Sequence, residues 1–182
     1  MPSSIEFWRT EHASFAKLLT LLEHKLAALQ SGGQPDYEAM LDIVQYLRHF
    51  PDLYHHPRED VAFACLARRD STLAPLLERL KAEHRSIAAA GEKLEILLSA
   101  AANDAFVGRE TIESAALDYL AAYRNHIANE ELIVMPRAGV LLTLEDWAAV
   151  ARAVPQAKDP LFGDHADERY RELRRQIANE SA

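Results

Sequence analysis

The chain has 182 residues, about half of them apolar (49%), with a formal net charge of −8 and a single cysteine. This length fits one domain, or a domain with a short appendage. The acidic balance without a basic cluster argues against nucleic acid or an anionic membrane as a partner, and one cysteine leaves no disulfide framework and no cysteine-based metal site. The chain has no apolar run of membrane-spanning length and no signal-peptide pattern at its start, so we expect a cytoplasmic protein.

Turn-forming residues divide the chain into segments that all have helical rather than strand periodicity. The first helix follows a capping box formed by Ser3 and Glu6, and a short helix follows a second box in "TLED" at 143–146. A loop and a charged helix are expected after about residue 160. The expected long helices run to about residue 30, from 36 to 69, from 73 to 102 and from 109 to 135, where Pro136 and Gly139 end the last one.

The second expected helix contains "YHHPRED", in which His55 and His56 precede Glu59 and Asp60 by one helical turn. Pro57 removes a backbone hydrogen bond there. One interpretation is a kink that aims His55 and Glu59 inward and turns His56 and Asp60 toward solvent or the surroundings of the site. The other is a new helix that begins at Pro57. His56 competes with His55 for the inward position, and the similar "NHIANEE" favours His55, since each histidine then precedes the first of two acids by four residues.

The other three long helices each carry a histidine within an apolar stripe, at the spacing that packs helices in a bundle. A single core histidine is more often bonded to a backbone carbonyl than to a metal, so no stripe is decisive alone. The stripes are Ile5, Trp8, His12, Phe15, Leu19 and Leu22 in the first helix; Leu73, Leu77, Leu80, His84, Ile87, Gly91, Leu94 and Leu98 in the third; and Tyr119, Tyr123, His126, Glu130 and Ile133 in the fourth.

An antiparallel up-down-up-down four-helix bundle would bring these polar core residues to one level, because residues equally distant from a connecting loop then lie side by side. The midpoints between successive candidates all fall within predicted loops. Burial of these groups without a metal would be costly, whereas two carboxylates can bridge a pair of cations that carry two imidazoles each. Iron or manganese suits such ligands, and zinc would also fit. The residues expected to meet are His12, His55, Glu59, His84, His126 and Glu130.

The motifs "HHPRED" and "NHIANEELIVMP", with the histidines of "FWRTEH" and "LKAEHRSI", resemble hemerythrin-like, or HHE cation-binding, proteins over residues 5–138. The resemblance implies an all-α fold: a hemerythrin-type antiparallel four-helix bundle with a short additional C-terminal helical segment. It also implies two non-haem iron ions joined by an oxo or hydroxo bridge. The implied terminal ligands are His12, His55, His84 and His126, and the implied bridging carboxylates are Glu59 and Glu130.

One departure from the oxygen-carrying hemerythrins lies one turn after His84, where they have a second histidine and this chain has Ala88. Four imidazoles in place of five would leave a coordination position open. The pattern is then closer to hemerythrin-like iron-repair and sensor proteins, although the cysteine-containing segment of the repair type is absent. Such an open site is expected to autoxidise quickly, which favours oxygen, nitric oxide or peroxide chemistry over reversible oxygen carriage.

The favoured function is a di-iron protein that binds or senses a small diatomic ligand, oxygen or nitric oxide, with a redox partner that the sequence does not name. The alternatives are a di-iron enzyme or iron donor, in peroxide or nitric oxide reduction or iron–sulfur repair, and a helical module with a structural metal. We expect residues 1–140 to form the bundle. Residues 141–182 are expected to form a helical extension that packs on it or mediates a homodimer.

Overall fold

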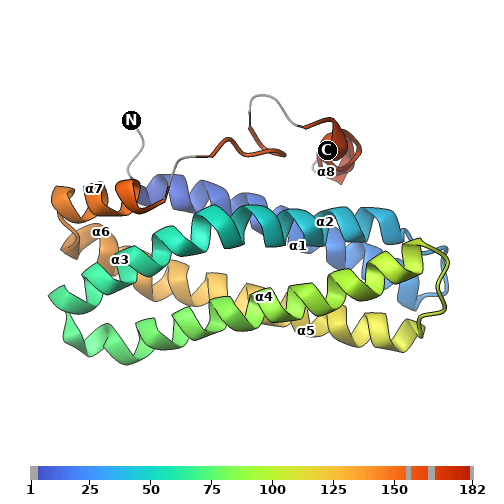
Figure 1. Ribbon diagram of the computed structural model, residues 1–182, viewed down its shortest axis with the longest axis horizontal. Coiled ribbons are helices and arrows are strands. Elements are labelled where there is room, and N and C mark those ends of the chain that lie inside the picture. The colour runs from blue at the N-terminus through green and yellow to red at the C-terminus, as the bar shows by residue number, and fades with distance from the viewer. Residues whose placement is uncertain (1–3, 155–156, 164–166, 181–182) are drawn as a thin grey trace.

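The computed structural model describes residues 4–154, 157–163 and 167–180, and every regular element in these ranges is helical. This confirms the all-α class. The long helices lie side by side along the long axis, as in a hemerythrin-type bundle (Figure 1). They are α1 (Ser4–Gln30), α2 (Tyr37–Phe50), α3 (His56–Arg69), α4 (Ala74–Ala102) and α5 (Arg109–Asn129), and the shorter ones are α6 (Met135–Leu141), α7 (Leu144–Ala153), α8 (Arg171–Glu180) and the 3-10 turns η2 (Ser71–Leu73) and η4 (Glu168–Tyr170).

Side-chain caps fix several helix ends where the sequence predicts them. The carboxylate of Asp36 accepts a hydrogen bond from the backbone N–H of Ala39 at the start of α2. Thr143 and Asp146 form the predicted reciprocal capping box at the start of α7. Ser3, the first residue of the other predicted box, lies outside the described residues.

Two π-helical turns lie within otherwise continuous helices, and each is followed two residues later by a proline. The turn η1 (Pro51–His55) joins α2 to α3 ahead of Pro57, and the backbone N–H of His56 donates to the carbonyl of Pro51. Proline lacks an N–H and its ring clashes with the carbonyl four residues earlier, so the helix widens by one residue and continues. Neither predicted interpretation of Pro57, a kink or a new helix after a break, describes this turn.

The second π-helical turn, η3 (Glu130–Val134), joins α5 to α6 ahead of Pro136. The helix therefore continues to Leu141, and the predicted end at Pro136 and Gly139 is wrong. The extra residue in the turn also shifts the buried face. Ile133, predicted to be in the core, is 39% exposed, whereas Val134 is 2% exposed.

The core otherwise follows the predicted stripes. All the stripe positions of residues 73–98 are buried, as are Trp8, Phe15 and Cys65. Ile5, at the end of the first stripe, is half-buried. Burial of these side chains supplies the main stabilisation of the bundle and fixes which residues face its interior.

The C-terminal residues pack on the long helices. The Arg69 guanidinium on α3 donates to the carboxylate of Asp146 on α7, and the Tyr46 hydroxyl on α2 donates to the carboxylate of Asp159. The apolar core beside α1 and α2 includes Leu161, Tyr170, Leu173 and Ile177.

Removal of residues 160–182 is expected to lower the melting temperature while leaving metal content per folded chain unchanged. Each buried apolar side chain that is lost contributes about 1.5–3 kcal/mol. None of the described residues after 140 lies in the histidine and glutamate groups of the site. Calorimetry and metal analysis of the truncated chain measure the two effects separately. A large loss of metal from chain that is still folded would mean that the tail supplies a ligand, with His165, outside the described residues, as the first candidate.

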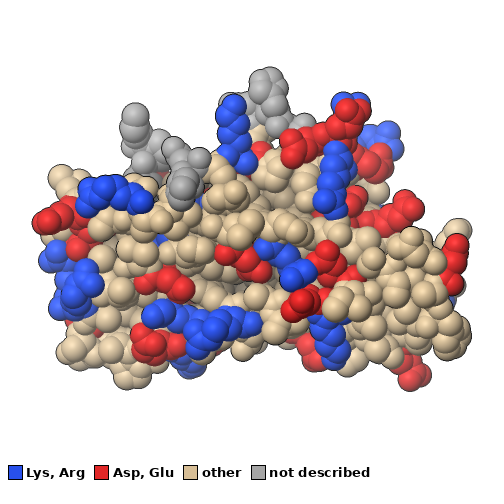
Figure 2. Space-filling model, in the orientation of Figure 1, with Lys and Arg blue, Asp and Glu red and all other residues tan. Residues whose placement is uncertain are grey.

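Acidic and basic side chains are interspersed on the face that Figure 2 shows, without one broad basic area. Among the described residues, no helix combines the length and the apolar character needed to cross a lipid bilayer.

Candidate metal centre

All six residues predicted to meet in the core are buried, and they face one another between the helices. His12 comes from α1, His84 from α4 and His126 from α5. Nε2 of His12 lies 3.0 Å from Nε2 of His55, so both rings point at the same small space. The helices therefore bring together the set that the sequence proposes, although whether each residue binds a metal stays a prediction.

The two glutamates each span both sides of this space. Oε1 of Glu59 lies 3.0 Å from Nε2 of His55, and its Oε2 lies 3.5 Å from Nε2 of His84. Oε2 of Glu130 lies 3.4 Å from Nε2 of His12, and its Oε1 lies 3.1 Å from Nε2 of His126. Each carboxylate thus offers one oxygen to each side, which is the placement that a bridging ligand requires.

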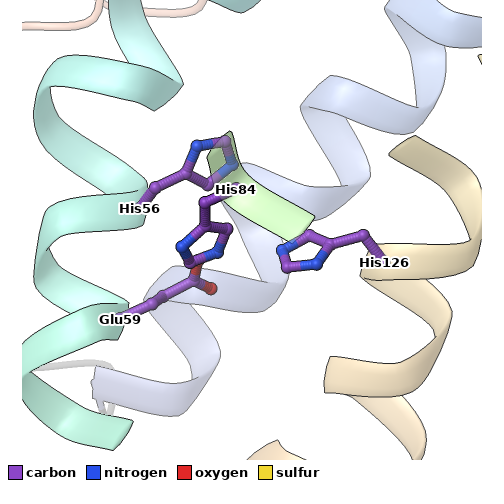
Figure 3. A group of neighbouring side chains, drawn as sticks. All are labelled: His56, Glu59, His84 and His126. Atoms are coloured by element: carbon purple, nitrogen blue, oxygen red, sulfur yellow. The ribbon is translucent and has the colours of Figure 1, made fainter. Parts of the chain in front are cut away.

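His56 also lies in the site: of the predicted alternatives, an orientation toward solvent is wrong, and both His55 and His56 are buried. The side chain of His56 is 5% exposed, and its ring stacks on that of His84 with the centroids 4.3 Å apart. Potential ligand atoms of His56, Glu59, His84 and His126 all lie within 4.8 Å of one another, and Figure 3 shows these side chains converging from neighbouring helices. A second group joins His12, His55 and Glu59.

The π-helical turn explains why two adjacent histidines both reach the interior. In a regular helix, successive side chains diverge by about 100°. At η1 the wider turn ends at His55, and α3 begins at His56. Both rings consequently face the core, on opposite sides of the shared Glu59. Five imidazoles, rather than the four predicted from the sequence, therefore lie in the two groups of converging side chains.

A further set of acids, which we call the outer carboxylates, holds these rings from outside. Each of the five histidines places Nδ1 at 2.9–3.1 Å from a carboxylate oxygen. A carboxylate oxygen accepts the bond, so Nδ1 carries the proton and Nε2 presents its lone pair inward. The pairs are His12 with Glu131, His55 with Glu11, His56 with Asp52, His84 with Asp60, and His126 with Glu83.

Several of the inward-facing atoms have no hydrogen-bond partner in the protein. Nε2 of His84 and of His126, Oε2 of Glu59 and both carboxylate oxygens of Glu130 are buried without a hydrogen bond. Buried polar atoms are normally paired, and leaving them unpaired costs roughly 1–3 kcal/mol each. Nitrogen and oxygen atoms that converge on one small space fit divalent or trivalent cations.

Without a metal, the site compensates its charges with protons. Burial alone lowers the pKa of His55, but Glu59 and the hydrogen bond to Glu11 raise it to about 10. Burial is likewise outweighed at His84, where Asp60, Glu130 and Glu59 raise the pKa to about 11. Burial and the neighbouring His84 hold the pKa of His56 well below its usual value. The metal-free site therefore binds protons, and a cation must displace these protons when it binds.

Comparison with known families agrees with this geometry. The family model of the hemerythrin HHE cation-binding domain matches residues 3–138. The chain belongs to this family. The hemerythrin match includes every histidine and glutamate of the site and ends before α7. A search of curated proteins found no significant match.

The sequence did not lead us to the outer carboxylates as a group, although a signal exists. Four of them directly adjoin an inward-facing residue of this hemerythrin domain. Glu11 precedes His12, Glu83 precedes His84, Asp60 follows Glu59, and Glu131 follows Glu130. The neighbour of an inward-facing residue on a helix points toward the adjoining helix, so an acid there is placed to reach the next histidine.

Metal binding by this hemerythrin domain is expected to release protons and to weaken as the pH falls. His55 and His84 are protonated near neutral pH in the metal-free protein, because their pKa values are raised to about 10 and 11. A cation must displace these protons, so its apparent affinity should rise with pH toward those values. Calorimetric titrations in buffers of different ionisation enthalpy count the released protons. Affinity that does not change between pH 6 and 9 would contradict the assignment of these two rings.

The metal-free protein should show the opposite dependence. A histidine whose folded-state pKa is raised stabilises the fold fully below its unfolded value and loses that contribution as the pH rises through the folded value. The stabilisation from His55 and His84 is thus expected to disappear as the pH approaches about 10 to 11. Denaturant unfolding of metal-free protein across this range measures it.

Proposed function

We propose that this protein is a non-haem di-iron protein that binds or senses oxygen or nitric oxide at a carboxylate-bridged centre. Its six ligands predicted from the sequence are His12, His55, Glu59, His84, His126 and Glu130, and we add His56 as a seventh. Iron suits a site rich in imidazole and carboxylate without thiolate. When bound, an iron pair supplies reversible one-electron chemistry and a Lewis-acidic position for a small ligand. Manganese and zinc fit the same donors and are the metals to test against it.

The observation that carries the proposal is the unequal division of imidazoles between the two sides of the site. His12 and His55 lie on one side, and His56, His84 and His126 lie on the other. The two bridging glutamates would give each ion an oxygen apiece. The three-histidine ion then has one protein ligand more than the two-histidine ion, and an octahedral ion on the two-histidine side keeps a position for an exogenous ligand.

The protein's residues give this position a small and largely apolar surrounding. The ring of Phe15 lies 5.0 Å from that of His55 and 6.4 Å from that of Tyr123, centroid to centroid. Such walls admit a small neutral molecule and exclude larger or charged ones. The outer carboxylates hold the imidazoles in place from behind, so binding does not require the ligands to reorganise.

The helical fold supports further parts of the proposal, which concern the bundle and its C-terminal extension. We infer an antiparallel up-down-up-down four-helix bundle of the hemerythrin type over residues 1–140. We assign residues 141–182 to a C-terminal helical extension packed on it. The proposal also includes a cytoplasmic location, a separate redox partner and a homodimer formed through the extension. It includes no nucleic-acid or membrane partner.

The test is an anaerobic spectroscopic titration of iron-loaded protein. Metal analysis should give two irons per chain, and the oxidised form should show the absorption bands of an oxo-bridged pair. Nitric oxide or oxygen added to the diferrous protein should give distinct optical and paramagnetic signals that are absent from zinc-loaded protein. A single iron per chain, or spectra that neither gas alters, would refute the proposal. Rapid catalytic turnover with peroxide and a reductant would favour the enzyme alternative.

A further inference from the structure

Two tryptophans link the site to the surface. Trp8 on α1 is 2% exposed, and its ring lies 6.4 Å from the His55 ring at an interplanar angle of 64°. On its other side, Trp8 meets Trp147 of α7, with the centroids 5.4 Å apart and the planes at 73°. Trp147 is half-buried and lines a groove open to solvent together with Arg9 and Leu144. Three aromatic rings in contact therefore lead outward from the histidine side of the site.

The contact between the two tryptophans is held by specific anchors. Nε of Arg69 on α3 donates to Oδ2 of Asp146 at 2.6 Å, and the same guanidinium donates to the hydroxyl of Thr143. Asp146 directly precedes Trp147, so this pairing fixes the start of α7 against the bundle. Trp147 lies beyond residue 138, where the hemerythrin match ends. The outer ring of the series is thus a feature of this chain's own extension.

Two tyrosines also adjoin the site, but their surroundings oppose oxidation. The Tyr123 ring lies 6.0 Å from that of His56, and Tyr119 lies 5.6 Å from Tyr123. A phenol that loses an electron must also release its hydroxyl proton, and both hydroxyls are buried without a hydrogen-bond acceptor. An indole can lose an electron before it loses a proton, so the tryptophans are the easier electron donors.

We propose that Trp8 and Trp147 carry oxidising equivalents from the metal centre to the surface, so that Trp147 is oxidised in place of the histidines of the site. This inference rests on the proposed iron function, and the oxidant is hydrogen peroxide. Each step moves one electron inward, from Trp147 to Trp8 and from Trp8 to the oxidised centre. After two such steps a solvent water would add to the oxidised indole of Trp147, which loses two protons, so that a C–H bond becomes C–O–H. At the centre the two electrons and two protons would convert hydrogen peroxide to two waters as its O–O bond breaks, so the net reaction forms hydroxytryptophan and releases one water.

The experiment treats iron-loaded, full-length protein with a small excess of hydrogen peroxide and locates added oxygen by peptide mass spectrometry. Trp147 should be the main oxidised residue in the wild type. In Trp8→Phe, which keeps a ring in place but is much harder to oxidise, oxidation of Trp147 should fall to the level of zinc-loaded protein. Tyr119→Phe is the matched control, because it removes an oxidisable phenol near the site without interrupting the series, and it should leave Trp147 oxidation unchanged.

A second variant keeps the test decisive if Trp8→Phe folds poorly. In Trp147→Phe, oxidation should shift to Trp8 and to the histidines of the site, and iron should be lost faster during peroxide treatment. Equal oxidation of Trp147 in zinc-loaded and iron-loaded protein, or in Trp8→Phe and wild type, would overturn the inference. Metal analysis before peroxide is added distinguishes this from failure of the proposed function, because a chain that retains no iron would refute both.

Discussion

Replacing Glu59 by alanine is expected to remove most of the bound metal from both sides of the site. Glu59 is the one residue shared by the two groups of converging side chains, with one oxygen toward His55 and the other toward His84. Its loss removes a ligand from each ion and the negative charge between them. It also leaves buried imidazoles to repel one another, which costs several kcal/mol. Metal analysis after gel filtration measures the effect.

The adjacent residue provides a matched control. Asp60 lies next to Glu59, is itself an acid, and accepts a hydrogen bond from Nδ1 of His84 on the outer side of that ring. Asp60→Asn keeps the shape and a hydrogen-bond acceptor, so affinity should fall by about 10–100-fold without abolition of binding. The double variant His126→Ala with Glu130→Ala should resemble Glu59→Ala. Full iron occupancy in Glu59→Ala or in the double variant would contradict the assignment of the site.

Replacing His56 by alanine is expected to make the diferrous protein oxidise in air much faster than the wild type. In the proposed centre His56 is the third imidazole on its side, and its ring stacks on that of His84. Without it, the ion on that side gains an open position that water can enter, and the space of a buried ring becomes available to solvent. Stopped-flow absorption after mixing with oxygen measures the rate, and iron content is measured first to show that both ions are retained.

Two comparisons decide whether His56 acts as a ligand in this way. His49→Ala removes an exposed histidine outside the site and should leave the oxidation rate unchanged. Ala88→His, expected to complete a four-imidazole site, should now have little effect in the wild type because the fifth imidazole is already present. If His56→Ala oxidises at the wild-type rate and Ala88→His slows oxidation, the site uses four imidazoles, and the rapid autoxidation expected from the sequence applies to the wild type.

Much of the fold and of the site could be predicted because the spacing of apolar residues along the sequence shows the helical periodicity. The stripe that includes Leu80 and His84 is buried at every position, and the six polar residues drawn from four separate segments meet in space. These predictions depend only on which residues share a helix face and on where turns occur. Both are local properties that single residues signal reliably.

Two of the differences from the sequence-based predictions share one physical cause. A π-helical turn adds a residue that regular periodicity does not anticipate, so the sequence did not indicate that His55 and His56 both face inward or that Val134 is buried in place of Ile133. Prolines at 57 and 136 were the visible signal, but proline predicts a break or a kink as readily as a widened turn. The outer carboxylates were missed because they depend on how adjoining helices are rotated, which one helix alone does not reveal.

The outer carboxylates also link the four helical segments to one another in a closed ring of hydrogen bonds. Glu11 of α1 reaches η1, Asp60 of α3 reaches α4, Glu83 of α4 reaches α5, and Glu131 of η3 returns to α1. Rotating or sliding any one segment by a residue would break its bond to the next and misalign an inward-facing group at the same time. A chain whose helices pack in the wrong register would therefore also lose the arrangement of side chains needed to bind metal. Metal retention should then report global folding errors even in variants altered far from the centre.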